Sequence, residues 1–445
     1  MSPSRRAFLR AGAVATGVLA AGPLRALEAL AAVEDGGAEP VEALAAAPGN
    51  AGYGPLRKAG PELDLPEGFR YVRFGVHGSP MSNGKPTPNF ADGMAAFPGP
   101  GGTVRLVRNH EVDGRVGAFA GRPYDGLGGG GTTNLVFDPK AGKLLASHPS
   151  LTGTVRNCAG GATPWGSWIT CEETTVGLDH GYDMPHGYCF EVPAAAVGPV
   201  KAMPLKAMGR FIHEAVCVDP RTGIVYETED RGRAGFYRFL PKTKGILAAG
   251  GRLQMLAIKG RPRLDLRTGQ RPGEWLPVKW VDIPDPDHRN AGHNPSEVFE
   301  QGEWRGGATF GRLEGCFWHD NGPWGGAWIV STDGGNAGLG QVWWFDPVNS
   351  RIKLVYESKW SSALRKPDNV SVSPRGTVVL CEDGDGIDRL RGLKGGHLFD
   401  IARNRSSHGE FAGCTWSPDG RWLFLNVQRP GATYAITGPW GRGPL

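Results

Sequence analysis

Six short runs of β-forming residues recur along the chain, and each run is led by a turn glycine and followed by polar or acidic residues. The leading glycines are Gly102, Gly166, Gly223, Gly326, Gly376 and Gly420. Because the same unit returns through most of the chain, we predict a repeated strand-forming architecture.

A second pattern precedes several of these runs. It consists of a strand, then Asp or Ser followed by Pro, one or two further residues and Gly. Proline fixes the first turn position and glycine supplies the positive φ that closes the turn. The copies are Leu135–Gly142, Val216–Gly223, Val370–Gly376 and Cys414–Gly420, with Trp344–Ser350 as a variant. Unevenly spaced strand-turn-strand units are typical of a β-propeller whose blades carry unequal insertions.

The six glycine-led runs predict an all-β, six-bladed propeller. The interval from Gly223 to Gly326 is the widest and contains the insertion Ile283–Ser296, so a blade hidden there would bring the count to seven. A β-sandwich is the alternative, but a sandwich would not repeat one hairpin around the whole chain.

The composition agrees with many short strands joined by tight turns, because the chain has 70 glycines, 36 prolines and 14 tryptophans. The alternating segment Asp64–Tyr71 predicts the first strand. We expect one propeller domain over residues 63–445, preceded by a linker over residues 33–62. The seven cysteines lie far apart and do not resemble a disulfide framework.

The N-terminus resembles an export signal. Ser4-Arg5-Arg6-Ala7-Phe8-Leu9 is a twin-arginine sequence, and a short alanine-rich apolar stretch follows it. We predict a signal peptide over residues 1–32, the twin-arginine export machinery as a partner, a periplasmic or extracellular location, and no stable membrane span. Without residues 1–32 the formal net charge falls from +5 to +2, which gives no argument for nucleic-acid binding.

Polar and acidic residues stand at equivalent ends of the repeated runs. They are Asn109, Glu111, Glu172, Glu173, Glu229, Asp230, Asp333, Glu382 and Asp383. In a radially symmetric fold such ends converge near the axis, where mutually repelling carboxylates favour bound cations such as calcium. The alternative is that these acids point outward as solubilising charges.

The segment Thr154–Thr174 adds a thiol, Cys158, to these acids. A thiolate together with carboxylates suits a cation of intermediate character such as iron. Cys158 lies upstream of the repeated unit, in a predicted turn that no other copy has. The alternative is a buried thiol beside a solvated acidic turn.

Several further segments carry candidate site residues. Arg312 and Glu314 lie two apart, so on a strand their side chains share a face; one could grip an anionic substrate while the other holds a metal. A plain surface ion pair is the alternative. His213 and Arg156 are further candidates for substrate binding, and Asp368 is a further oxygen donor. No GxSxG or GxxxxGK[ST] motif occurs, which favours metal-assisted hydrolysis.

Taken together, these motifs resemble the PhoX-type alkaline phosphatases over nearly the whole mature chain. The resemblance rests on the twin-arginine signal and on Asn109–Glu111, Asn157–Gly161, Thr163–Gly166, Cys171–Glu173, Arg210–Glu214, Tyr226–Asp230, Arg312–Gly315, Pro367–Asn369, Cys381–Asp383, Glu410–Gly413 and Ser417–Gly420. It implies a six-bladed propeller with an axial site that contains iron (Fe³⁺) and calcium (Ca²⁺).

The resemblance also implies roles for individual residues. Arg312 would contact the substrate phosphate, and Arg312 and Glu314 would be the catalytic pair. The implied metal ligands are Cys158, Glu172, Glu229, Asp230, Glu314, Glu382, Glu111, Glu173 and Asp368. The chain is compact beside the longer members of the family, so insertions that shape the substrate site are expected to be missing.

We predict a secreted, metal-dependent, monomeric phosphatase that hydrolyses small phosphomonoesters. The alternatives are a calcium-dependent propeller phosphodiesterase or lactonase, and a non-catalytic propeller binding module whose acids hold structural calcium.

Overall fold

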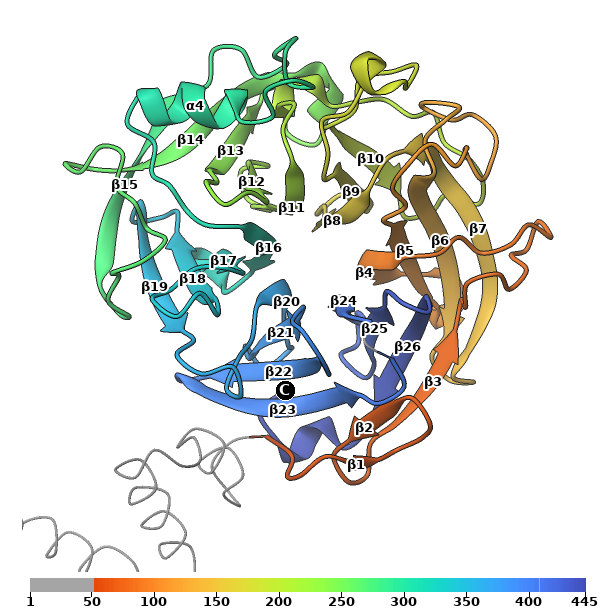
Figure 1. Cartoon of the computed structure of the whole chain (residues 1–445). Coiled ribbons are helices and arrows are strands. Elements are labelled where there is room, and N and C mark those ends of the chain that lie inside the picture. The colour runs from red at the N-terminus through yellow and green to blue at the C-terminus, as the bar shows by residue number, and fades with distance from the viewer. Residues whose placement is uncertain (1–51, 408) are drawn as a thin grey trace, which may run out of the picture.

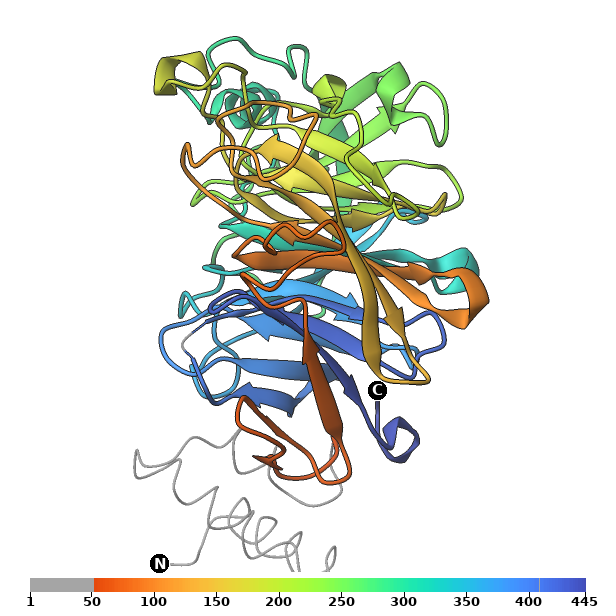
Figure 2. The same cartoon turned by 90° about the vertical axis from the view of Figure 1, so that its right-hand side faces the viewer.

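The structure, a computed structural model, describes residues 52–407 and 409–445. Its strands stand around a common centre, and the chain passes from one group of strands to the next around the ring (Figure 1). Seen from the edge, the molecule is a flattened disc with long loops gathered on one face (Figure 2). The prediction of an all-β, propeller-like fold is therefore confirmed, while the predicted signal peptide lies outside the described residues.

Two four-stranded sheets and one three-stranded sheet lie next to one another in the ring. The first four-stranded sheet contains β4 (Ala91–Pro98), β5 (Val104–His110), β6 (Gly130–Asp138) and β7 (Lys143–Thr154). The three-stranded sheet contains β8 (Asn157–Ala162), β9 (Ser167–Glu172) and β10 (Cys189–Pro193). The second four-stranded sheet contains β24 (Phe411–Trp416), β25 (Leu423–Val427), β26 (Ala432–Thr437) and β3 (Arg70–Phe74). The pairing of N-terminal β3 with C-terminal β26 is antiparallel and closes the ring.

A six-stranded sheet begins at β20 and takes its outer strands from the N-terminal part of the chain. It contains β20 (Pro367–Val372), β21 (Val378–Glu382), β22 (Arg389–Lys394), β23 (His397–Asn404), β2 (Leu63–Leu65) and β1 (Arg57–Lys58). Strand β1, which falls within the predicted linker, thus extends this sheet.

A nine-stranded sheet occupies the rest of the ring. In spatial order it contains β11 (His213–Val218), β12 (Val225–Glu229), β13 (Phe236–Pro241), β14 (Gly251–Ile258), β15 (Trp275–Asp282), β19 (Arg351–Glu357), β18 (Gln341–Asp346), β17 (Gly326–Ser331) and β16 (Leu313–His319). Its two halves are joined at their outer edges by β15 and β19, which pair over Trp275–Pro277. Its two end strands, β11 and β16, both lie at the centre of the ring (Figure 1).

Six inner strands, β4, β8, β11, β16, β20 and β24, surround the centre, and each contacts the next around the ring, including β24 with β4. The six glycine-led runs of the sequence form the strands paired with them, namely β5, β9, β12, β17, β21 and β25. The widest interval, Gly223 to Gly326, contains β13–β15 and one α-helix, α4 (Glu297–Trp304). Within the described residues of that interval, β16 is the only inner strand.

Short 3-10 helices occupy several of the connections between strands. They are η1 (Pro100–Gly102), η2 (Leu178–His180), η3 (Lys206–Met208), η4 (Leu247–Ala249), η5 (Gly322–Trp324) and η6 (Trp440–Arg442). None of the helices in the described part of the chain is long and apolar enough to cross a membrane.

Two details differ from the sequence prediction. The predicted first strand, Asp64–Tyr71, is divided between β2 and β3, because Pro66 and Gly68 form a turn in which the N–H of Phe69 donates to the carbonyl of Pro66. The Pro-Gly hairpin signature also marks two different places. In three copies it joins an inner strand to the next strand, whereas Leu135–Gly142 and Trp344–Ser350 join a third strand to a fourth.

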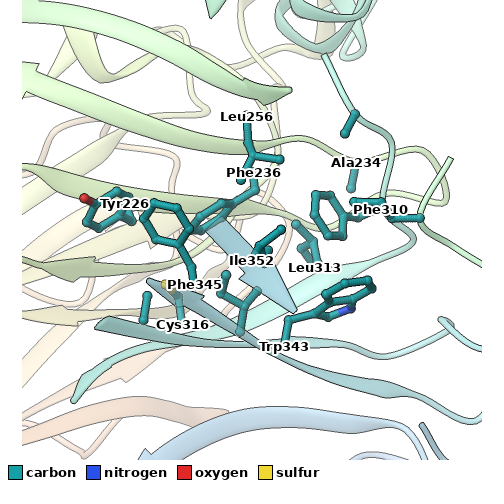
Figure 3. Packing of buried hydrophobic residues seen from close by; sticks show 14 of the residues in the cluster. Tyr226, Ala234, Phe236, Leu256, Phe310, Leu313, Cys316, Trp343, Phe345 and Ile352 are labelled. Carbon is teal, nitrogen blue, oxygen red and sulfur yellow. The ribbon is translucent and has the colours of Figure 1, made fainter. Parts of the chain in front are cut away.

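Aromatic and aliphatic side chains fill the space between the two halves of the nine-stranded sheet (Figure 3). Phe345 on β18 packs edge-to-face against Tyr226 on β12, with ring centroids 5.2 Å apart. Phe310 packs against Trp343 at 5.6 Å in the same way. Complete burial of such a side chain contributes about 2 kcal/mol. This packing fixes β11 and β16 against each other, and with them the residues that they bring to the centre.

Candidate metal centre and active site

Each inner strand has a β-bulge directly after its start. The register against the neighbouring strand shifts there in all six cases. A bulge opposes two residues to one and re-aims a side chain, so it can turn a residue away from the sheet toward the ring centre. The residues at the second position of the six strands are Asp92, Cys158, Glu214, Glu314, Asp368 and Ala412. Five of the six offer a metal-ligand side chain.

A repeated hydrogen bond brings a second residue of each unit beside the first. The residue directly after the second strand donates its N–H to the carbonyl of the residue directly before the inner strand. The pairs are Glu111 to Phe90 (2.8 Å), Glu173 to Arg156 (2.9 Å), Asp230 to Ile212 (3.2 Å), Thr332 to Arg312 (2.9 Å), Asp383 to Lys366 (3.0 Å) and Gln428 to Glu410 (3.2 Å). Four of these six donors are acids, so the repeat delivers further carboxylates to the same level of the ring.

The side chains converge into four overlapping groups whose ligand atoms lie within 4.8 Å of one another. The groups are Cys158–Glu173–Glu214, Glu214–Glu314–Asp368, Asp368–Asp383–Glu410 and Asp92–Glu111–Glu410. Because Glu214, Asp368 and Glu410 are each shared by two groups, the set forms a chain of carboxylates with a thiol at one end. We call these nine residues the axial ring.

Burial and mutual repulsion raise the pKa values of several carboxylates of the axial ring and so disfavour their charged form. Burial, and after it the charges of Glu314 and Glu173, raises the pKa of Glu214 well above its ordinary value. Burial is also the main cause that raises the pKa values of Glu111 and Asp368 to about 7. Such groups ionise more readily when a cation lies among them. The axial ring therefore has the electrostatic character of a multivalent cation site.

Cys158 is part of the sixfold pattern and does not lie in a turn of its own, as the sequence had suggested. It is the second residue of β8, equivalent to Asp92, Glu214, Glu314 and Asp368 on the other inner strands. Its Sγ lies 3.4 Å from the carbonyl oxygen of His213 and 3.5 Å from that of Glu214. Burial, followed by the charge of Glu214, raises the pKa of the thiol well above its ordinary value. A metal cation would favour the thiolate form.

Three basic residues lie at the edge of the axial ring, each directly before an inner strand. Arg156, Arg312 and Lys366 have φ values of 51°, 38° and 45°, a region that side chains other than glycine rarely adopt. Backbone strain of this kind, about 1–3 kcal/mol per residue, is common where a side chain must be held for function. Arg156 and Arg312 were predicted as substrate contacts, whereas Lys366 was not.

Arg312 is held by two carboxylates. Its Nε and Nη2 donate to Oδ1 and Oδ2 of Asp230 at 2.8 and 2.9 Å, and Nη2 also donates to Oε1 of Glu314 at 2.6 Å. Burial alone would lower the pKa of Arg312, but the hydrogen bonds to Asp230 and the charge of Glu314 raise it above its ordinary value. Its side chain is 30% exposed. The guanidinium is therefore fixed, cationic and accessible.

Arg156 lies beside Glu173, with its Nη1 3.5 Å from the carbonyl oxygen of Glu173. Its Nη2 donates to Oδ2 of Asp113 at 2.5 Å. Burial alone would lower the pKa of Arg156, but this hydrogen bond and the charges of Glu173 and Glu111 raise it above its ordinary value. Lys366 lies with its Nζ 3.7 Å from Oδ1 of Asp333. Both side chains are more than a third exposed.

Four of the predicted metal ligands, Glu172, Glu229, Asp230 and Glu382, lie outside these four groups. Successive residues of a strand face opposite ways, so the two members of each acidic pair differ. Glu173 and Asp383 belong to the axial ring, and Asp230 accepts the hydrogen bonds of Arg312 beside it. The remaining members of the pairs accept hydrogen bonds from nearby groups. Glu172 accepts from the N–H groups of Val155, Gly187 and Tyr188 and lies against His186. Glu229 accepts from the N–H of Gly235 and the hydroxyl of Tyr237, and Glu382 accepts from the N–H groups of Arg365 and Arg389 and from Nε of Arg391. Through these hydrogen bonds Glu172, Glu229 and Glu382 stabilise the loops beside the axial ring.

His213 lies behind the ring and not at its surface. Its side chain is completely buried, its ring centroid is 3.6 Å from that of Phe211, and it belongs to a separate group with Cys189 and Glu227. The side chain of this predicted substrate contact is therefore closed to solvent in the structure.

Sequence reasoning missed four members of the axial ring: Asp92, Glu214, Asp383 and Glu410. A signal existed for Asp92, because Asp92-Gly93 at the start of an inner strand matches Glu314-Gly315. The sequence contains the acidic pair Glu382-Asp383 but predicts Glu382, and not Asp383, as the metal ligand. Glu410 departs from the repeat: it directly precedes β24, whose second residue is Ala412.

A cavity of about 370 Å³ lies beyond the axial ring along the same inner strands. Its lining begins at the residues that directly follow the ring ligands, including Gly93, Ala159, Ala215 and Gly315, and is mostly apolar. The charged rim formed by Arg156, Arg312 and Lys366 does not line this cavity.

The closed ring of strands and the buried acids and thiol at its centre define an all-β, propeller-like protein with a candidate polynuclear metal centre. The model of the alkaline phosphatase PhoX family matches residues 51–126 and 130–431. The chain therefore belongs to the PhoX alkaline phosphatase family. This confirms the prediction of a PhoX-like phosphatase.

One solved structure that the chain resembles gives the same fold. Pseudomonas fluorescens PhoX in complex with vanadate, a transition state analogue, is 15% identical and superposes with a TM-score of 0.64, over 86% of this chain and 97% of that one. Virginiamycin B lyase from Staphylococcus aureus is 10% identical, with a TM-score of 0.41, over 83% of this chain and 99% of that one. A search of curated protein sequences gives no significant match.

Proposed function

We propose that this chain is an exported phosphomonoesterase whose axial ring binds iron and calcium. The observation that carries the proposal is the convergence of Cys158 with eight carboxylates beside a fixed, accessible Arg312. Membership of the PhoX family supports phosphate-ester hydrolysis as the reaction.

The donor set of the axial ring suits two kinds of cation. Cys158, Glu173 and Glu214 offer a thiolate with carboxylates, which suits iron. The groups Asp92–Glu111–Glu410 and Asp368–Asp383–Glu410 offer only oxygen ligands, which suits calcium. Glu214, Glu314 and Asp368 would link the two regions. Bound metal ions would lower the pKa of a coordinated oxygen species and offset the negative charge that develops during hydrolysis.

The protein's own residues orient the substrate. Guanidinium geometry matches phosphate oxygens, and Nη1 of Arg312 makes no hydrogen bond within the described chain, so it can donate to a phosphate. Asp230 and Glu314 hold this guanidinium in place and lower the reorganisation that binding requires. Arg156 and Lys366 add positive charge at the rim and attract an anionic ester.

The blade count and the location of the protein belong to the same proposal. Six inner strands, six bulges and six equivalent backbone hydrogen bonds support six blades, with the nine-stranded sheet counted as two blades joined through β15 and β19. The twin-arginine sequence at Arg5 and Arg6 supports export of the folded, metal-loaded chain to the periplasm or beyond, where we expect it to act as a monomer.

The test is to purify the chain from the compartment to which it is exported and to measure its iron and calcium by elemental mass spectrometry. We expect both metals, turnover of p-nitrophenyl phosphate, loss of turnover on calcium chelation, and recovery with Ca²⁺. The Glu314→Gln variant should lose turnover, while Glu303→Gln, at a surface ion pair with Arg233, should keep it.

Unchanged turnover by a folded, metal-free preparation would refute the metal-dependent mechanism. Preference for a phosphodiester or a lactone over the monoester would favour the alternative enzymes. Stabilisation by calcium without turnover of any ester would favour a binding module.

A further inference from the structure

A second group of metal-ligand side chains lies behind the axial ring, between two neighbouring sheets. Cys189 on β10, His213 on β11 and Glu227 on β12 present ligand atoms within 4.8 Å of one another, and all three side chains are completely buried. Cys171 on β9 lies directly opposite Cys189 in the strand register. From this geometry we propose a structural zinc site formed by Cys171, Cys189, His213 and Glu227, separate from the proposed catalytic metals.

Three distances between the donor atoms agree with the edges of a tetrahedral zinc site, while Cys171 lies outside the group whose ligand atoms are within 4.8 Å of one another and would complete the site from beside Cys189. Sγ of Cys189 lies 3.5 Å from Nδ1 of His213, Nδ1 of His213 lies 3.5 Å from Oε2 of Glu227, and the two Sγ atoms lie 3.7 Å apart. With standard zinc–ligand distances, tetrahedral geometry gives about 3.6 Å for S to N, about 3.4 Å for N to O and about 3.8 Å for S to S. Two sulfurs, a nitrogen and an oxygen form a donor set that suits zinc.

Glu227 supplies an independent observation. Neither of its carboxylate oxygens has a hydrogen-bond partner among the described residues, although the side chain is completely buried. An unpaired buried carboxylate is costly, so such groups are normally paired or bound to a metal. By contrast, Glu229, two residues further along β12, accepts hydrogen bonds on Oε2 from the N–H of Gly235 and the hydroxyl of Tyr237.

The orientation of His213 also matches that of a metal ligand. Its Nε2 lies 3.1 Å from the carbonyl oxygen of Gly209, which can only accept a hydrogen bond, so Nε2 carries the proton. In the neutral ring Nδ1 then offers its lone pair toward Cys189 and Glu227. A hydrogen bond from the remote ring nitrogen to a carbonyl is the usual support of a metal-bound histidine. Stacking on Phe211 fixes the plane of the ring.

A zinc ion at this position would tie β9 and β10 to β11 and β12. It would also fix the start of β11, where His213 is followed by Glu214 of the axial ring. Because no side chain of the site is exposed, zinc would have a structural role and would not meet the substrate. Binding releases the protons of the two thiols and uses no redox step.

The experiment uses the full chain, loaded with Zn²⁺ during expression, and compares three preparations by elemental mass spectrometry. The unmodified protein should contain one zinc ion per chain. Glu227→Gln and Cys189→Ser should each lose at least about nine-tenths of it, whereas Cys217→Ser, a buried thiol on β11 near Cys316, should retain it. Glu314→Gln should also retain zinc, which separates this site from the axial ring.

X-ray absorption at the zinc edge keeps the proposal testable even if a variant fails to fold. The unmodified protein should show a four-coordinate zinc with two sulfur ligands and two nitrogen or oxygen ligands. The absence of stoichiometric zinc, zinc without sulfur ligands, or a Cys171–Cys189 disulfide in peptide mass spectra of the exported protein would each overturn the proposal.

Discussion

Arg312 and Asp230 form a two-pronged ion pair across the junction of β12 and β16, with Nε and Nη2 of the guanidinium 2.8 and 2.9 Å from the two carboxylate oxygens. Both residues occupy repeat positions, since Arg312 directly precedes an inner strand and Asp230 directly follows a second strand. The sequence places them 82 positions apart, and the ring brings them together.

The Arg312→Lys substitution tests whether this geometry matters for catalysis. A lysine retains the positive charge but cannot make two parallel hydrogen bonds to Asp230 while it contacts a phosphate. We expect kcat/KM for p-nitrophenyl phosphate to fall about 100-fold, with metal content unchanged. Arg351→Lys is the matched control, because Arg351 pairs with Asp346 at a distant hairpin and should leave kinetics intact. A lysine variant with kinetics equal to those of the parent would exclude Arg312 as a phosphate contact.

The Cys158→Ala substitution tests the proposed iron ligand. Removal of the thiolate takes the only sulfur donor from the axial ring, so iron should drop to less than about a tenth of its normal content while calcium persists. Iron is measured by elemental mass spectrometry, together with the visible thiolate-to-iron absorption. The control is Cys414→Ala, which removes a buried thiol from inner strand β24. Full iron content in the Cys158 variant would show that the thiol is not a ligand.

The Gly315→Ala substitution tests how closely the inner strands approach. A Cβ on Gly315 would lie 2.6 Å from the carbonyl oxygen of Asp368 and 2.7 Å from the nitrogen of Val370, both backbone atoms of β20. We expect a loss of about 1–3 kcal/mol in the free energy of unfolding and weaker calcium binding, because Glu314 and Asp368 are forced apart. Gly121→Ala, where a Cβ meets no atom within 4 Å, should change stability by less than about 0.5 kcal/mol. Chemical denaturation and calcium titration measure both effects.

The His186→Gln substitution should change stability in a pH-dependent way. Burial alone would lower the pKa of His186, but the charge of Glu172 and hydrogen bonds to Glu172 and Asp125 raise it above 6.5. A histidine with a raised folded-state pKa stabilises fully below its unfolded pKa, and the contribution disappears as pH rises through the folded pKa. The variant should therefore lose about 2 kcal/mol near pH 5.5 and less at alkaline pH.

Urea denaturation at a series of pH values measures this difference. The exposed His397 provides the control, since His397→Gln should follow the parent protein at every pH. A stability loss in His186→Gln that is independent of pH would mean that the imidazole packs without carrying charge.

Much of the strand content could be predicted because it depends on local chemistry. Every glycine-led run became the second strand of a unit, since a turn glycine followed by β-branched and aromatic residues favours a strand wherever it stands. The acids after these strands were found for the same reason. Which acid of each pair faces the centre was not predictable, because a shift of one residue in strand register exchanges the two faces.

Cys158 shows the limit most clearly. In the sequence, Cys158 stands in a glycine-rich segment that does not resemble the segments around Asp92, Glu214, Glu314 and Asp368. The sequence therefore predicts a turn residue outside the repeat. In the fold it occupies the same bulged position as those four acids. A bulge depends on pairing with a neighbouring strand, and single-chain periodicity does not record that pairing.

The sequence by itself determined the repeated strands, the family and the kinds of ligand available, because turn chemistry and side-chain type are local properties. The tertiary structure decided which side chains meet. It brought Glu173 and Asp383 into the axial ring in place of Glu172 and Glu382, and it paired Asp230 with Arg312. It also added Asp92, Glu214 and Glu410, and it placed His213 beside Cys189 and Glu227, away from the ring. The physical reason is that distances between ligands on different strands depend on ring closure and strand register, which arise only when the whole chain has folded.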